Sequence, residues 1–216
     1  MRVLVTGCNG QVGFLLKKML VNKVQLLALT RQELDITNET LVNETVSNFK
    51  PSVVINAAAY TAVDKAESEA ELAFSINRDG AEYLAKAANK ADAALIHIST
   101  DYVFEGNKSG LYSESDTVNP QGIYGSSKLA GEAVVKECCD KHIILRTAWV
   151  FGEHGNNFVK TMLRLAKDRD ALSIVSDQFG GPTYAGDIAK VIIDIIKKIE
   201  ADTPIKWGVY HYSGIP

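Results

Sequence analysis

The sequence predicts an α/β fold in which a doubly wound, mostly parallel sheet carries helices on both faces. Three observations support this fold class. Short runs rich in Val, Ile and Leu alternate with longer segments in which apolar residues recur three and four positions apart. The short runs are apolar throughout, as expected for strands that helices cover on both sides. The first run ends in a glycine-rich turn that leads directly into a helical segment.

The expected elements follow one another along the whole chain of 216 residues. Strands are predicted at 2–6, 24–29, 52–56, 94–99, 142–146 and 208–213. Helices are predicted at 11–22, 39–49, 79–90, 127–138 and 185–200, with a further one beginning near 156. From about residue 150 onward Gly, Asn and Pro become frequent, which indicates the loops of a smaller lobe. We therefore expect a main domain over 1–150, part of a lobe over 151–183, and a helix and strand that return to the sheet over 184–216.

Composition excludes several classes of protein. The formal net charge is −3 and the basic residues are scattered, so the chain has no basic stripe for nucleic acid. The apolar runs are too short to cross a bilayer, and no signal peptide precedes the first strand. The three cysteines, Cys8, Cys138 and Cys139, form neither a disulfide framework nor a metal-ligand spacing. We expect a cytoplasmic protein that binds no nucleic acid, membrane or metal.

The turn "VTGCNGQVG" has the character of a dinucleotide-binding loop. Gly7, Gly10 and Gly13 follow the first strand and open a helix, with Gln11 and Val12 between them. Glycines allow a sharp turn and a close approach of the backbone to a pyrophosphate, whose charge the helix N-terminus stabilises. The context of strand, glycine turn and helix makes this a stronger indication than the glycines alone. The sheet is therefore predicted to be a Rossmann sheet.

The end of the second strand bears on the choice of cofactor. An acidic side chain there would bind the ribose 2′-hydroxyl of NAD, but Thr30 and Arg31 occupy the position. The Arg31 guanidinium suits a 2′-phosphate, so NADPH is predicted, with NADH tolerated. A solvated arginine at a strand end remains an equal alternative for this residue.

The stretch "YGSSKLAGE" places Lys128 four positions after Tyr124. Residues four apart lie on one face of a helix, so the two side chains are expected to share a pocket. An ammonium near a phenol favours the phenolate, which would let Tyr124 release a proton near neutral pH. Alone, this spacing also occurs in many solvated helices.

Several stretches together resemble the extended short-chain dehydrogenase/reductases. These stretches are "TGCNGQVG", "NAAAYTAVDKAE", "ISTDYVFEG", "YGSSKLAGE" and "RTAWVFG". The second and third are similar to one branch in particular, the dTDP-4-dehydrorhamnose reductases. That resemblance implies reduction of a 4-keto sugar nucleotide, with the hydride supplied by the nicotinamide and the proton by the protein.

The resemblance also assigns roles to individual residues. Tyr124 matches the proton donor, Lys128 the residue that binds the nicotinamide ribose, and Thr100 the hydroxyl that bonds the substrate carbonyl. Asp101, Tyr102 and Trp149 match residues that orient the sugar, although Trp149 also suits a plain core position. Further cofactor contacts are implied for Asp35, Ile36, Ala59, Tyr60 and Thr61.

Three features qualify the resemblance. Nucleotide-sugar dehydratases of the superfamily have a glutamate where this chain has Tyr102, which favours simple reduction over dehydration. Some reductases of this branch carry a glutamate for a magnesium site between subunits, and Leu15 stands in that region, so no such metal is expected. A homodimer remains possible, but its interface is not predicted. The family continues beyond "YHYSGIP", so an incomplete substrate lobe is expected.

The leading hypothesis is therefore a reductase that converts dTDP-4-dehydro-6-deoxy-L-mannose to dTDP-L-rhamnose with NAD(P)H. Two alternatives stay open. The first is a non-catalytic, nucleotide-binding regulatory subunit resembling that of methionine adenosyltransferase. The second is a 4-ketoreductase that acts on another nucleotide sugar.

Overall fold

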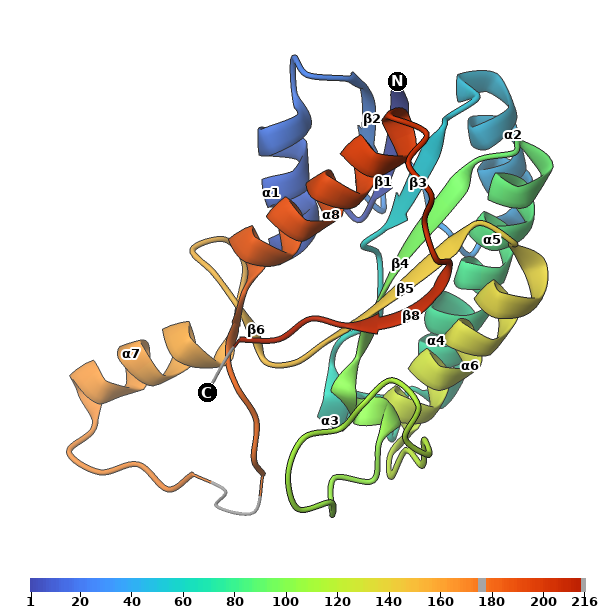
Figure 1. Ribbon diagram of the computed structural model, residues 1–216. Coiled ribbons are helices and arrows are strands. Elements are labelled where there is room, and N and C mark those ends of the chain that lie inside the picture. The colour runs from blue at the N-terminus through green and yellow to red at the C-terminus, as the bar shows by residue number, and fades with distance from the viewer. Residues whose placement is uncertain (175–177, 215–216) are drawn as a thin grey trace.

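The computed structural model describes residues 1–174 and 178–214 (Figure 1). Residues 175–177 of the expected lobe and 215–216 at the end of the chain lie outside the described residues. No helix in the described part is long and apolar enough to span a membrane.

A parallel sheet forms the centre of the molecule, in the order β2-β1-β3-β4-β5-β8 among the described strands. The strands are β1 (Arg2–Thr6), β2 (Gln25–Leu29), β3 (Val53–Asn56), β4 (Ala94–Thr100), β5 (His142–Thr147) and β8 (Gly208–His211). Each lies at its predicted place to within two residues, and every pairing between them is parallel. The doubly wound α/β class predicted from the sequence is thereby confirmed.

Helices cover both faces of this sheet (Figure 1). On one face α2 (Glu39–Phe49), α5 (Gly80–Lys90) and α6 (Ile123–Cys138) pack their apolar residues against the sheet. On the other face α1 (Gln11–Leu20) and α8 (Ala185–Glu200) lie side by side over a second core. The fully apolar strands are explained by this arrangement, because their side chains are buried in both directions.

The segment before α5 contains helices that were not predicted. Two short helices, α3 (Val63–Ala66) and α4 (Ala70–Phe74), lead into a π-helical turn (Ser75–Asp79) that continues into α5. Helix α6 also begins earlier than predicted, at Ile123, so Tyr124 lies in its first turn. Short helices were missed because their few apolar positions give no clear period.

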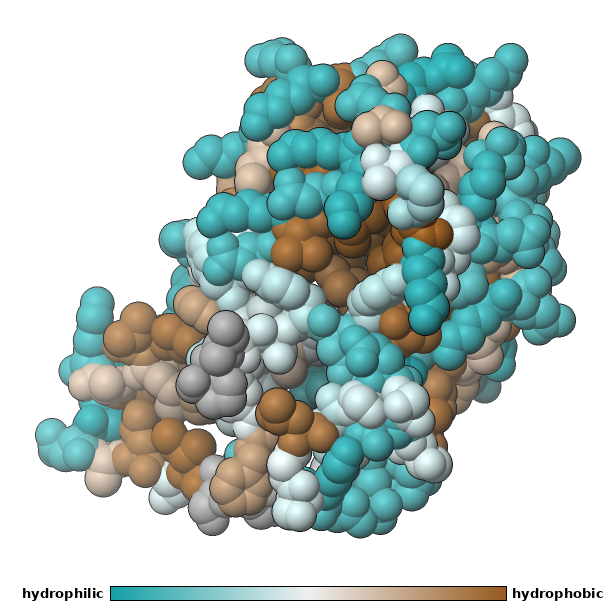
Figure 2. Space-filling model, viewed as in Figure 1, coloured by the Kyte–Doolittle hydropathy of each residue, from teal (hydrophilic) through white to brown (hydrophobic). Residues whose placement is uncertain are grey.

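The region between β5 and α8 projects away from the sheet and its covering helices (Figure 1). It holds the short strands β6 (Val150–Phe151) and β7 (Thr183–Tyr184), which pair in parallel, and the helix α7 (Phe158–Asp168). None of the described residues of α7 is buried, and Phe158, Val159 and Leu163 are exposed. Figure 2 shows apolar side chains gathered over this helix.

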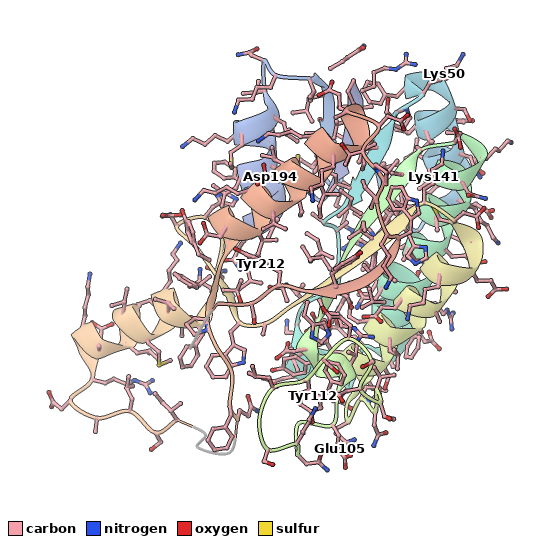
Figure 3. All side chains as sticks on the ribbon, viewed as in Figure 1. Lys50, Glu105, Tyr112, Lys141, Asp194 and Tyr212 are labelled. Carbon is pink, nitrogen blue, oxygen red and sulfur yellow. The ribbon has the colours of Figure 1, made fainter. Side chains whose placement is uncertain are left out.

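Parallel strands bring their carboxyl ends to one edge of the sheet. Lys50 and Lys141, which precede β3 and β5, lie toward the opposite edge, whereas Glu105 and Tyr112 lie on the loop that follows β4 (Figure 3). The order in which strands are added to the sheet reverses at β1, since β2 lies on one side of it and β3 on the other, and such sheets bind ligands at this point.

Candidate active site

The glycine turn at the carboxyl end of β1 permits a close approach that no larger residue allows. Gly7 has φ of +67°, and a Cβ on it would lie 2.6 Å from the backbone nitrogen of Ala58. A Cβ on Gly13 would overlap the carbonyl oxygen of Gly7. The turn therefore brings β1, β3 and the N-terminus of α1 together, with first-turn N–H groups that have no partner within the helix.

A cavity of about 300 Å³ opens beside this turn. Its walls include six predicted cofactor residues: Gly7, Gly10, Arg31, Asp35, Ile36 and Ala59. A glycine cradle, a helix N-terminus and a mostly apolar wall suit a dinucleotide, so the residues present fit the predicted cofactor.

Arg31 and Asp35 form an exposed pair on the rim of the cavity, 3.8 Å apart. Burial acts to raise the pKa of the Asp35 carboxyl, but the hydrogen bonds from Thr37 and the charge of Arg31 together lower it. The Arg31 side chain is 64% exposed, which leaves its guanidinium accessible to a phosphate.

Other predicted cofactor residues lie differently. Val12 is a buried residue of α1. Gln11 donates to the carbonyl of Val150 and accepts from Asn157, so it connects the glycine turn to the lobe. The Tyr60 hydroxyl donates to Glu69 at 2.7 Å. The Thr61 side chain is exposed. None of these four residues is part of the cavity wall.

Thr100 and Tyr124 meet at the carboxyl end of β4. Thr100 is the last residue of that strand, and its hydroxyl lies close enough to the Tyr124 phenol to act on the pKa of that phenol. It also donates to Asp101 Oδ1 at 3.0 Å and accepts from the backbone N–H of Tyr102. The Tyr102 ring lies edge-on to that of Tyr124, with centroids 5.4 Å apart. Burial raises the pKa of the Asp101 carboxyl.

The pKa of Tyr124 in the structure is raised, whereas the sequence analysis expected it to be lowered. Burial, with the charge of Asp101 acting in the same direction, raises the pKa of Tyr124 to about 12, although the Thr100 hydroxyl opposes the shift. Because a buried phenolate is poorly solvated, the residue is held as the neutral phenol at pH 7. The predicted lowering toward neutrality is therefore corrected.

Lys128 is 2% exposed, and its side chain contacts strand β4. Its ammonium Nζ donates to the carbonyl of Ile98 at 2.7 Å and lies 3.5 Å from His97 Nε2. Burial lowers the pKa of Lys128 to about 8, while the charge of Glu132 opposes that shift. The shared helical face was foreseen, but the partners on β4 were not.

Trp149 lies beyond the end of β5 with φ of +47°, in the left-handed region. Its ring is 37% exposed and packs against Phe158 of α7 at a centroid distance of 6.1 Å. The alternative of a plain core residue is therefore wrong, and the side chain is available to a ligand.

Two sets of positioning contacts were not found from the sequence. The Glu67 carboxylate accepts from the N–H of Ile123 at 2.8 Å and so caps the first turn of α6. The buried Asn77 side chain accepts from the N–H of Tyr60 and donates to Ser127 Oγ in α6. Both hold the helix that carries Tyr124. Neither contact has a local signal in the sequence, because each joins segments that lie far apart in the chain.

Comparisons with known proteins identify the family and the fold. The model of the family described as "RmlD substrate binding domain" matches residues 1–215. The chain belongs to this family. A dTDP-4-dehydrorhamnose reductase of Aggregatibacter actinomycetemcomitans is 54% identical over 100% of this chain and 74% of its own. That of Escherichia coli K12 is 46% identical over 98% and 72%.

Solved structures of such reductases have the same fold. One from Bacillus anthracis, in complex with NADP, has a TM-score of 0.93 and 43% identity, covering 100% of this chain and 75% of its own. One from Clostridium acetobutylicum has a TM-score of 0.92 and 46% identity, covering 98% and 74%. The chain thus spans about three quarters of these relatives. The resemblance noted in the sequence is confirmed.

Proposed function

We propose that the protein reduces the 4-keto group of dTDP-4-dehydro-6-deoxy-L-mannose to give dTDP-L-rhamnose, with Tyr124 as proton donor and NADPH as the preferred reductant. The observation that carries the proposal is the meeting of the Thr100 and Tyr124 hydroxyls at the carboxyl end of β4. They lie at the same sheet edge as the glycine turn, in a chain whose relatives are named as reductases of this substrate.

Carbonyl reduction needs a hydride at carbon and a proton at oxygen, and a bound nicotinamide supplies the hydride. The chain supplies the rest. Because its raised pKa keeps Tyr124 protonated at neutral pH, its O–H is available to donate as negative charge develops on the carbonyl oxygen. Thr100 adds a second hydroxyl at the same point. Lys128 would hold the nicotinamide ribose of the bound cofactor.

The surrounding residues support reduction rather than dehydration. Removing water from a sugar ring requires a carboxyl acid and base, and Tyr102, packed edge-on against Tyr124, stands where the dehydratases have a glutamate. We place Asp101, Tyr102 and Trp149 around the sugar, with Trp149 presenting its exposed ring at the junction with the lobe.

Arg31 is proposed to select NADPH over NADH. Its exposed guanidinium lies on the cavity rim, where a 2′-phosphate would accept from it. In Arg31→Ala the Kd for NADPH is expected to rise about tenfold, because one exposed charge-assisted contact is lost. NADH affinity should be unchanged. Arg2→Ala, at the other end of β1, is the matched control. Fluorescence titration measures the Kd of both variants for NADPH and NADH.

The function is tested by following NADPH oxidation with a panel of dTDP- and UDP-linked 4-keto sugars. Fastest turnover with dTDP-4-dehydro-6-deoxy-L-mannose, and formation of the L-rhamnose product by NMR, is the expected result. Faster reduction of a different nucleotide sugar would replace the substrate but keep the reaction class. Cofactor binding without reduction of any ketone in the panel would contradict the proposal.

A further inference from the structure

Three buried polar side chains, Asn56, His97 and Lys128, follow one another within contact distance across strands β3 and β4 and helix α6. Asn56 ends β3 and His97 lies in β4, and the two residues are paired in register. Both are 1% exposed. Asn56 Nδ2 lies 3.1 Å from His97 Nδ1, and His97 Nε2 lies 3.5 Å from Lys128 Nζ. The proposed reaction gives no role to either Asn56 or His97.

The orientation of the Asn56 amide is set by a backbone group. The N–H of Ala58 donates to Asn56 Oδ1 at 3.2 Å, and a backbone N–H can only donate. The Thr6 hydroxyl donates to the same oxygen at 2.9 Å. The amide must therefore turn its NH₂ group toward His97 Nδ1.

This orientation selects one tautomer of His97. Burial is the larger cause that holds the pKa of His97 well below its usual range, and the charge of Lys128 adds to it when Lys128 is protonated, so the ring is neutral and carries one proton. Nδ1 has to accept from Asn56, which leaves the proton on Nε2. An N–H of the ring consequently faces Lys128.

An N–H directed at an ammonium group is an unfavourable contact between two donors. It becomes a hydrogen bond when Lys128 is the neutral amine, because Nζ then has a lone pair. The carbonyl of Ile98 can accept from Lys128 in both forms, because the amine and the ammonium each have an N–H group to donate.

The other charged groups around Lys128 do not replace a missing counter-ion. On its own helix lie Tyr124, which is neutral, and Glu132, whose carboxylate is bound by Arg146 of β5 at 2.8 and 2.7 Å. After β4, the Asp101 carboxylate accepts from Thr100, and its charge raises the pKa values of Tyr124 and Tyr102.

We propose that His97 is a positioning residue that sets the protonation of Lys128. With its tautomer fixed by Asn56, it presents Nε2–H to Nζ and favours the amine over the ammonium. Lys128 then exchanges its proton closer to neutral pH than burial alone would allow. Resting on the proposed function, this makes Lys128 a group that changes its protonation near neutral pH instead of a permanent cation.

The tautomer of His97 is the first measurement. Long-range ¹H–¹⁵N NMR spectra of the free protein are expected to show a protonated Nε2 and an unprotonated Nδ1 in the wild type. In Asn56→Asp, a carboxylate accepts from both Ala58 N–H and the ring, so the proton should move to Nδ1. A wild-type ring protonated on Nδ1, or on both nitrogens, would overturn the proposal.

The titration of Lys128 is the second measurement, followed through its ¹³Cε signal, which is assigned from its loss in Lys128→Met. We expect the pKa of Lys128 to rise by about one pH unit, a tenfold gain in proton affinity, in Asn56→Asp and in His97→Gln. The glutamine variant is neutral and can offer its amide oxygen to Nζ. It therefore separates the tautomer effect from an added charge, and decides the matter if the aspartate variant fails to fold.

His142→Gln is the matched control, because His142 lies near the amino end of β5, where its Nδ1 contacts the carbonyl of Cys139. It should leave the titration of Lys128 unchanged. An equal titration in His97→Gln and His142→Gln would overturn the proposal. Since no substrate is needed, a failed reductase assay leaves this result intact, and an active reductase does not rescue it.

Discussion

Helix α6 carries two buried charged groups one turn apart, and they differ in what surrounds them. The Glu132 carboxylate, 0% exposed, accepts from Ser99 at 2.6 Å and from two nitrogens of Arg146. Among the described residues, Lys128 contacts one carbonyl and one ring nitrogen and forms no ion pair with a carboxylate. One position is fully paired, and the other is buried with an incomplete set of partners.

The difference separates a structural site from a functional one. The Glu132–Arg146 pair joins α6 to β5. Removing either member strongly lowers the stability of the fold, because the other charge is left buried without a partner. The region of Tyr124 and Lys128 instead has two displaced pKa values, one raised and one lowered. Displaced pKa values of this kind are a feature of groups that exchange protons.

The largest expected effect is on catalysis at the incompletely paired end. Tyr124→Phe keeps the ring but removes the proton, so kcat should fall about 10²- to 10⁴-fold, measured by NADPH oxidation. Tyr83→Phe on α5 removes a phenol away from this site and should retain wild-type turnover. A Tyr124→Phe rate equal to that of the control would exclude Tyr124 as the acid.

The next effect is on stability at the fully paired end. Arg146→Met should lower the free energy of unfolding by about 3–5 kcal/mol, because Glu132 is left as an uncompensated buried charge. Urea denaturation at pH 7 measures it. Lys197→Ala removes the exposed pair with Asp194 (Figure 3) and should cost under about 1 kcal/mol. A similar decrease in the free energy of unfolding for Arg146→Met and Lys197→Ala would mean that burial does not make the Glu132–Arg146 pair more important for stability.

A third effect is a pH dependence of stability specific to Lys128. Unfolded, this lysine keeps its proton up to about its ordinary pKa of 10.5, whereas folded it releases it near 8. Between those values the unfolded state binds more protons, so its contribution to stability rises with pH, and it is unfavourable at lower pH by about 3 kcal/mol.

The check is a difference measurement. Urea unfolding of the wild type and of Lys128→Met is compared from about pH 7 to pH 10, where the difference cancels the other titrating groups. The variant should be the more stable at the acid end, with the gap closing as the pH rises. A gap that stays constant across this range would show that Lys128 titrates normally.

The smallest expected effect concerns the cap of α6. Glu67→Ala removes the carboxylate that accepts from Ile123 N–H, and should lower stability by about 1 kcal/mol. Glu71→Ala, in the first turn of α4, serves as the control. If the Glu67 variant also lowers kcat while the control does not, the cap positions Tyr124 as well as stabilising the helix.

Much of the framework was predictable because its determinants are local. The apolar strands, the periodic helices and the turn at Gly7, Gly10 and Gly13 are each readable within a short window, and all lie where predicted to within a few residues. The helices α3 and α4 and the π-helical turn were missed, because each is shorter than the window in which a helical period can be recognised.

The candidate site divides in the same way. The sequence by itself determined that Tyr124 and Lys128 share a helical face and that Thr100 stands at a strand end, because both facts follow from chain geometry. Only the tertiary structure decided that Lys128 points to Ile98 and His97, and that the pKa of Tyr124 rises. Desolvation and hydrogen-bond partners come from strands remote in the chain, and no local spacing encodes them.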